Sequence, residues 1–306
     1  MMSGAARGVA AMVAACTIWG LSPMYYKMLS HVPAMEVLSH RMIWSLAFFG
    51  VVLAAQGRLR EVTRSMNTSR SFGLVAVASL MIAANWALFI WSVQTGRTTQ
   101  TSLGYYIYPL VAVVIGRLVF GERLGAVQWT AVCLATVAVM VLTLGLGTAP
   151  WIALILALTF GLYGMIKKQL DVGPVVSVTA EVLLLVPVAG FILLQTYHNT
   201  GTVFGEDMRT MALLIFAGPI TAVPLILFSF AARRLAMTTI GLLQYINPTL
   251  QFACAVFVFS EPFGQWHLVA FVLIWTALAF YSVSALRQDS ARRRAVRAAA
   301  ASGTVL

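Results

Sequence analysis

Residues 106–109 of the chain are Tyr-Ile-Tyr-Pro, and residues 245–248 are Tyr-Ile-Asn-Pro. The two prolines are 248 − 109 = 139 positions apart, and this offset aligns further identical residues: Thr99 with Thr238, Phe120 with Phe259, Glu122 with Glu261 and Gly125 with Gly264. Earlier in each half an offset of 161 − 20 = 141 aligns a second group: Gly20 with Gly161, Met24 with Met165, Lys27 with Lys168 and Pro33 with Pro174. The chain is therefore predicted to contain two copies of one unit.

The composition excludes an ordinary soluble domain. Of the 306 residues, 60% are hydrophobic and 9% are charged, and the mean hydropathy is +0.90. Soluble domains carry about 25% charged residues. Stretches such as 74–93 are apolar on every side, whereas the strands of a membrane β-barrel alternate polar and apolar residues over about 10 positions. The predicted fold class is all-α, a polytopic membrane protein.

Charged residues and Gly, Pro and Asn divide the chain into ten apolar segments. Because a membrane-spanning helix needs about 20 mostly apolar residues, we predict spans at 6–27, 35–55, 72–94, 101–119, 126–146, 151–169, 175–196, 210–231, 238–259 and 265–286. The connections are short except at 56–71 and 197–209. They leave no room for a nucleotide-binding domain, and no phosphate-binding Gly-rich loop followed by Lys is present, which argues against an ATP-driven pump.

Each predicted repeat contains five spans. Five is an odd number, so the second copy enters the membrane from the opposite side and the repeats are inverted. In this architecture substrate sites lie near the middle of the membrane, between the repeats, and it is typical of transporters. We predict a first five-helix repeat at 1–147, a second, inverted repeat at 148–287 and a basic tail at 288–306.

The basic residues indicate the orientation of the chain. The net charge of +11 comes from 20 Lys and Arg against 9 Asp and Glu. Three of the 20 lie on one side of the predicted membrane (Lys27, Arg97 and Arg209), Arg41 lies inside a span, and the other 16 lie on the opposite side. The positive-inside rule then places both termini in the cytoplasm. The expected partners are the lipid bilayer and a small-molecule solute, and no nucleic acid; the basic tail is interpreted as an anchor at anionic lipid.

No cofactor and no metal site is expected. Cys16, Cys133 and Cys254 lie far apart in apolar runs without a Cys-x-x-Cys spacing, so we interpret them as packing residues.

Three stretches of the first repeat also resemble a known family: Trp-Gly-Leu-Ser-Pro-Met-Tyr-Tyr-Lys at 19–27, His-Val-Pro-Ala-Met-Glu at 31–36 and His-Arg-Met-Ile-Trp-Ser at 40–45. They resemble the RarD-like branch of the EamA family, in the drug/metabolite transporter superfamily. The Gly-Glu-Arg at 121–123 resembles the repeat pattern of that family, from which the second copy departs with Ser260 and Pro262. The resemblance implies ten helices and the transport of small metabolites or drugs, often amino acids moved outward.

Two charged groups lie inside predicted spans. Arg41 follows His40 in the second span, and Glu181 lies in the seventh; the offset 181 − 40 = 141 makes Glu181 equivalent to His40. A charge at membrane depth is costly unless it is paired or hydrated. These side chains are either an ion pair that holds helices together or coupling and gating groups. In the second interpretation, Glu181 binds and releases a proton.

Glu122 and Glu261 each precede a predicted helix after a short turn. A carboxylate near a helix N-terminus accepts hydrogen bonds from free backbone amides there. We predict that both residues cap helices.

The fourth and ninth spans carry the best binding signal. Thr101, Tyr105 and Tyr108 recur at helical spacing, and Gln244 and Asn247 take the matching face of the ninth span. Amides do not face lipid, so this face meets protein or a wet cavity. Pro109 and Pro248 each free a backbone carbonyl at this level. Contacts that only hold helices together are the alternative. Further predicted neighbours of the solute are Trp19, Asn85, Trp86, Tyr163 and Tyr245.

The sequence thus predicts a secondary transporter of the bacterial inner membrane, monomeric, that exports small organic solutes such as amino acids or amphiphilic metabolites, with protons as the candidate coupling ion. The alternatives are an integral-membrane enzyme and a passive channel or scaffold. Nine acidic residues, mostly in loops, and four scattered histidines argue against an enzyme, which needs clustered carboxylates or metal ligands.

Overall fold

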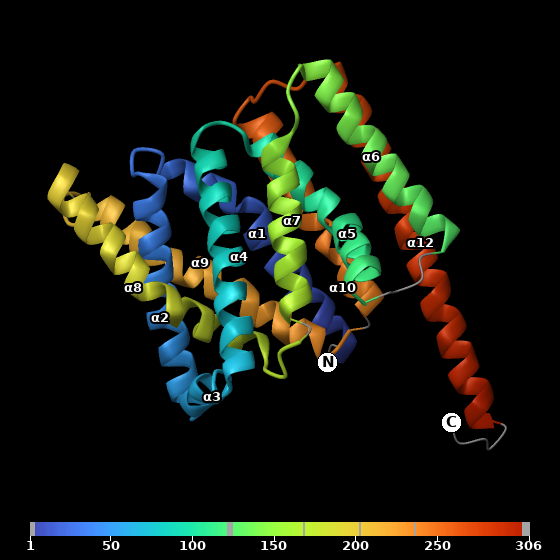
Figure 1. Cartoon of the computed structure of the whole chain (residues 1–306), viewed down its shortest axis with the longest axis horizontal. Coiled ribbons are helices and arrows are strands. Elements are labelled where there is room, and N and C mark those ends of the chain that lie inside the picture. Colours follow the sequence, from blue (N-terminus) through green and yellow to red (C-terminus); the bar gives the residue numbers. More distant parts are fainter. Residues whose placement is uncertain (1–3, 121–124, 168, 202, 236, 302–306) are drawn as a thin grey trace.

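The computed structural model describes residues 4–301 except 121–124, 168, 202 and 236, and within these residues every regular element is a helix (Figure 1). The elements are α1 (Gly4–Met28), α2 (Ala34–Ala55), α3 (Leu59–Arg64), α4 (Ser69–Gln94), α5 (Thr98–Phe120), α6 (Ala126–Leu146), α7 (Trp151–Lys167), α8 (Pro174–Thr200), α9 (Met208–Ala232), α10 (Met237–Gln244), α11 (Ile246–Ala253), a π-helical turn (Cys254–Val258) and α12 (Gln265–Ala301).

Ten segments of the described chain match the ten predicted spans. Nine of them are long and apolar enough to cross a membrane, and the tenth, α7, has 17 residues, the lower limit for a spanning helix. The chain is therefore an all-α polytopic membrane protein with two inverted five-helix repeats, as predicted. The boundary at 147 and 148 between the repeats stays a prediction.

The helices of the two halves interlock. Helix α1 packs on α9, α10 and α11, and its counterpart in the second half, α7, packs on α4 and α5. The equivalent pairs α2 with α8 and α6 with α12 also pack on one another; Figure 1 shows α6 and α12 side by side at one edge of the molecule. The centre is therefore built from both halves of the chain.

Two features of the helices go beyond the predicted spans. The segment 238–259 is not one helix, because it is interrupted at Tyr245 and ends in a π-helical turn. Pro248 lacks the amide that would bond to the carbonyl of Gln244, the last residue of α10. The predicted tail also begins as helix, since α12 has 37 residues and continues to Ala301.

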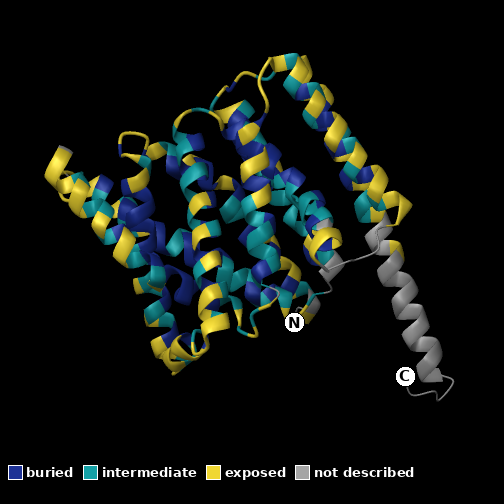
Figure 2. Cartoon of the chain, viewed as in Figure 1, coloured by how far each residue is buried: buried dark blue, intermediate teal, exposed yellow. Residues whose placement is uncertain are grey.

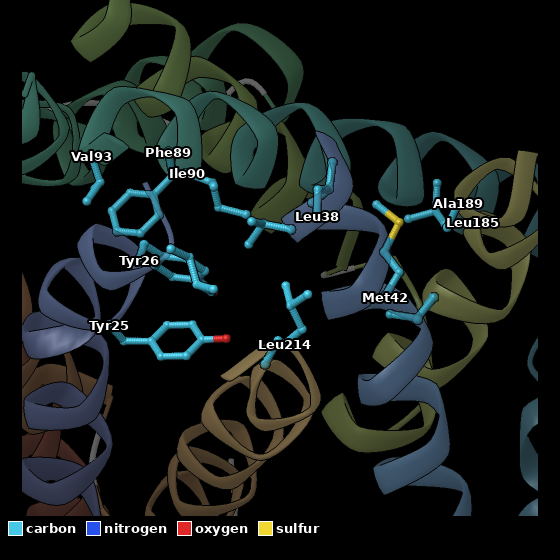
Figure 3. Packing of buried hydrophobic residues seen from close by; sticks show 14 of the residues in the cluster. Tyr25, Tyr26, Leu38, Met42, Phe89, Ile90, Val93, Leu185, Ala189 and Leu214 are labelled. Carbon is cyan, nitrogen blue, oxygen red and sulfur yellow. The ribbon is translucent and has the colours of Figure 1, made fainter. Parts of the chain in front are cut away.

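Close helix approach at the centre depends on small residues. A Cβ atom on Gly218 of α9 would lie 2.4 Å from the backbone oxygen of Trp44 on α2, so only glycine allows these backbones to approach so closely. Figure 2 shows exposed residues along the outer faces and buried residues where the inner helices meet. Figure 3 shows Tyr25 and Tyr26 of α1 facing residues of α2, α4 and α9 in this buried centre.

Candidate solute-binding site

Arg41 of α2 lies in the buried centre and is 7% exposed. Its guanidinium carbon is 3.9 Å from the ring centre of Trp86 on α4 and 5.7 Å from that of Tyr26 on α1. Its Nε donates a hydrogen bond to Thr221 Oγ1 on α9, at 3.0 Å. Helices of both repeats therefore surround this cation, and the sequence prediction that Arg41 lies inside a span is confirmed.

Asn85 and Tyr105, both predicted site residues, are hydrogen-bonded. The Tyr105 hydroxyl donates to Asn85 Oδ1 at 3.0 Å. Asn85 Nδ2 donates to the Leu156 carbonyl at 3.1 Å and to Thr159 Oγ1 at 3.0 Å, both on α7. The amide is fully buried among these partners. Asn85 therefore holds the half-buried Tyr105 ring in place and joins α4 to α7.

A row of aromatic rings continues from Tyr105 along α7. Phe160 lies 5.8 Å from Tyr105, 4.8 Å from Tyr108 and 6.0 Å from Tyr163, measured between ring centres. The sequence prediction missed Phe160. The repeat contains the signal that identifies it, because the offset 160 − 19 = 141 makes Phe160 equivalent to Trp19, which was predicted.

Glu181 is paired with Lys167, and not with His40 or Arg41. Its carboxylate, which is fully buried, accepts hydrogen bonds from Lys167 Nζ at 2.5 Å, Ser177 Oγ at 2.8 Å and Tyr163 Oη at 3.0 Å. The pair joins the end of α7 to α8. Tyr163 thus connects the aromatic row to an ion pair that the sequence prediction did not include.

His40 contacts a different part of the molecule from Arg41. Its ring stacks on Phe204, in the connection before α9, with 4.6 Å between ring centres and 21° between planes. Trp44, one turn further along α2, lies 6.4 Å from the same phenylalanine. Within the described part of the chain, His40 Nε2 and Trp44 Nε1 are both buried and have no hydrogen-bond partner.

The polar face of α11, in the second repeat, contacts α5 of the first repeat. Asn247 Oδ1 accepts a hydrogen bond from Gln251 Nε2 at 2.9 Å, and Gln251 Oε1 accepts one from Thr101 Oγ1 at 3.4 Å. The carbonyl of Pro248 accepts a hydrogen bond from Ser102 Oγ at 2.8 Å. Half-buried Gln244 ends α10. The predicted face is thus partly occupied by contacts between helices.

Two predicted site residues lie elsewhere. Tyr245 lines a groove of about 370 Å³ together with Tyr106, Thr249 and Trp275, between α5, α11 and α12. The half-buried Trp19 packs on Phe228 of α9, with 6.0 Å between ring centres. Neither of these contacts involves the rings around Arg41.

Glu261 caps a helix, but not the one that follows it. Its carboxylate accepts hydrogen bonds from the Thr98 and Thr99 amides, at 2.6 and 2.7 Å, and from Thr99 Oγ1 at 2.8 Å. These groups open α5 of the first repeat, whereas α12 begins only at Gln265. Glu122, predicted to have the same role, lies outside the described residues.

Known proteins with similar sequences support one family. The EamA-like transporter family matches residues 6–144. The protein RarD of Streptomyces exfoliatus is 42% identical over 94% of this chain and 91% of its own length, and the protein RarD of Escherichia coli (strain K12) is 39% identical over 92% and 95%. This chain belongs to the EamA-like transporter family.

Two further comparisons concern a second transporter and the fold. An uncharacterized transporter of Vibrio cholerae is 38% identical over 95% of this chain and 97% of its own length. A solved crystal structure shares the fold, with a TM-score of 0.62 and 15% identity over 92% of this chain and 97% of that one. The resemblance inferred from residues 19–45 is therefore confirmed, and the molecule is a multi-pass membrane protein of a bacterial transporter family.

Proposed function

We propose that this protein is a secondary transporter that exports small organic solutes across the bacterial inner membrane by alternating access, with both termini in the cytoplasm and no enzymatic activity. The observation that supports this most is the group around Arg41, in which side chains from α1, α2, α4 and α9 of both repeats meet in the buried centre. Inverted-repeat transporters place their substrate sites between the repeats.

The solutes that suit this site are small and amphiphilic. The rings of Trp86, Tyr105 and Tyr108 are half-buried and provide apolar contact together with hydrogen-bonding groups. Asn247 and Gln244, at the junction of α10 and α11, add amides that can bind either an ammonium or a carboxylate. Amino acids with apolar side chains and amphiphilic metabolites combine these features.

The proposal includes proton coupling through Glu181, and the ion pair between Glu181 and Lys167 supports this role. Protonation of Glu181 would remove the charge that holds Lys167 and would change the hydrogen bond from Tyr163; these two contacts join α7 to α8. It would also change the hydrogen bond from Ser177, which lies on α8 itself. A local change of charge that alters the contact between two helices is the kind of event that drives a two-state transition.

The test is trans-stimulated uptake in proteoliposomes containing the purified protein. A panel of radiolabelled amino acids and amphiphilic drugs is offered outside vesicles that are either empty or preloaded with the same unlabelled solute. A carrier takes up at least one solute faster into preloaded vesicles. Equal uptake into both kinds of vesicle would support the alternative of a passive channel, and uptake no greater than in protein-free vesicles for the whole panel would contradict transport of these solutes.

A further inference from the structure

Arg41 is a buried cation without a carboxylate partner among the residues that the structure describes. The ion pairs within those residues join Arg58 to Glu61 and Lys167 to Glu181. The described hydrogen bond of the Arg41 guanidinium is the one from Nε to Thr221. A guanidinium has five N–H donors, so the four on the two terminal nitrogens have no protein acceptor in the described part of the chain.

The stacking on Trp86 does not use those donors. With 3.9 Å between the guanidinium carbon and the ring centre, the indole covers one face of the guanidinium, while the N–H groups point outward in its plane. Such stacking is typical of arginine and stabilises the cation. It does not replace an anion, because an aromatic ring accepts none of the in-plane hydrogen bonds.

We propose that Arg41 binds the carboxylate of the transported solute through its two terminal nitrogens. A planar carboxylate matches the fork of N–H donors and makes two parallel charged hydrogen bonds. The rings of Trp86 and Tyr26, which lie near the guanidinium, and that of Phe89, which packs on Tyr26, then contact an apolar or aromatic body. This inference rests on the proposed transport function, and it narrows the substrate class to organic carboxylates.

The same geometry predicts that the carboxylate of the solute, and not an amino group, determines binding at Arg41. Glu181 is already bonded to Lys167, Ser177 and Tyr163. Glu36, the other acid buried in these two equivalent helices, accepts a hydrogen bond from the Val203 amide at 3.2 Å. Neither acid lies in the described contacts of Arg41, so the group of the solute that Arg41 recognises is the carboxylate, and not an ammonium.

Binding of matched probes to the purified full-length protein in detergent tests the inference. The probes are radiolabelled 3-phenylpropanoate, which has a carboxylate, and 3-phenylpropanamide, which has the same body without charge; affinities are measured by equilibrium dialysis. We expect the carboxylate to bind at least about tenfold more tightly than the amide, because each hydrogen bond to a charged group adds substantially to affinity. Equal affinities, or no binding of the carboxylate, would overturn the inference.

Three variants locate the effect at Arg41. Arg41→Gln should weaken carboxylate binding by about tenfold to a hundredfold and leave amide binding nearly unchanged. Arg41→Lys keeps the charge but not the fork, and should retain part of the affinity. The matched control Arg60→Gln removes an exposed arginine in α3 and should bind like the wild type. Wild-type carboxylate affinity in a monodisperse Arg41→Gln protein would overturn the inference, and if that variant does not fold, the comparison of the two probes on the wild type decides.

Transport of the same two probes separates this inference from the proposed function. Carboxylate-selective binding in detergent without uptake in proteoliposomes would support the anion site and contradict the transporter. Uptake of the amide and the carboxylate at equal rates and with equal affinities would support the transporter and overturn the anion site.

Discussion

At the scale of single residues, the ion pair between Lys167 and Glu181 decides how proton coupling must be tested. Replacing Glu181 alone would leave Lys167 as an unpaired cation that is 20% exposed, and breaking a buried pair destabilises a protein by about 3 kcal/mol. Replacing both partners avoids that cost. The double variant Lys167→Met with Glu181→Gln is therefore the appropriate protein for a transport assay.

In this double variant we expect flux driven by a pH gradient to be abolished while exchange of solute for solute continues. The reason is that exchange needs only the binding site, whereas net proton-driven flux needs a group that binds and releases the proton. Solute uptake is measured in proteoliposomes with and without a pH gradient. An unchanged response to the gradient would show that Glu181 is not the proton carrier.

The predicted binding residues Tyr105 and Gln244 make a second test at this scale. Loss of the Tyr105 ring removes contacts with Phe89 and Phe160 as well as any contact with solute. We expect Tyr105→Ala and Gln244→Ala each to raise the half-saturating solute concentration by about tenfold to a hundredfold, which corresponds to 1–3 kcal/mol. The control is Trp129→Ala on the exposed face of α6. Wild-type affinity in both variants, at normal expression, would mean that this face serves packing alone.

At the scale of helices, the cap on α5 links the two repeats. Glu261→Ala would leave the Thr98 and Thr99 amides without their acceptor, and loss of a helix cap costs about 0.5–2 kcal/mol. We expect a lower melting temperature in detergent, with Glu261→Gln less affected because its amide oxygen still accepts a hydrogen bond. Glu206→Ala, at an exposed acid, is the control. A melting temperature equal to that of the wild type in Glu261→Ala would show that the cap contributes nothing to stability.

Hydropathy and the repeat were sufficient to predict the helices, but not how they are interrupted. The same Tyr-Ile-x-Pro motif lies in continuous α5 and at the break between α10 and α11. The local sequences are nearly identical, so the difference must come from the packing around each helix, which a local pattern does not describe. Helix α12 also continues beyond the predicted span at 265–286, because charged residues end a membrane span without ending a helix.

The site could be predicted only where the signal was local. Polar residues inside apolar spans identified Arg41, Asn85 and Glu181. Their partners Trp86, Tyr105 and Lys167 lie on other helices. Trp86 and Tyr105 were included as aromatic residues in spans, but Lys167 was not, because it lies at the end of a helix and reads as an ordinary basic residue facing water. Which residues pair depends on how the two repeats cross.

At the scale of the whole molecule, the orientation in the membrane is a prediction with a direct test. A single cysteine at Asn199, an exposed position near the end of α8, should react with a membrane-impermeant maleimide added to intact cells. The background replaces Cys16, Cys133 and Cys254, and a cysteine at exposed Arg60 is the matched control, expected to react only after lysis. The opposite pattern at the two positions would reverse the orientation.

The measurement that tests the central claim most directly is counterflow by the purified protein in proteoliposomes. Vesicles are preloaded with an unlabelled solute from the panel and diluted into a trace of the same solute in labelled form. A carrier that exposes one site alternately to the two sides predicts that the label rises transiently above its equilibrium level inside the vesicles, and that Tyr105→Ala needs a higher solute concentration for the same effect. Label that only approaches equilibrium, at the same rate in preloaded and empty vesicles, would contradict the account.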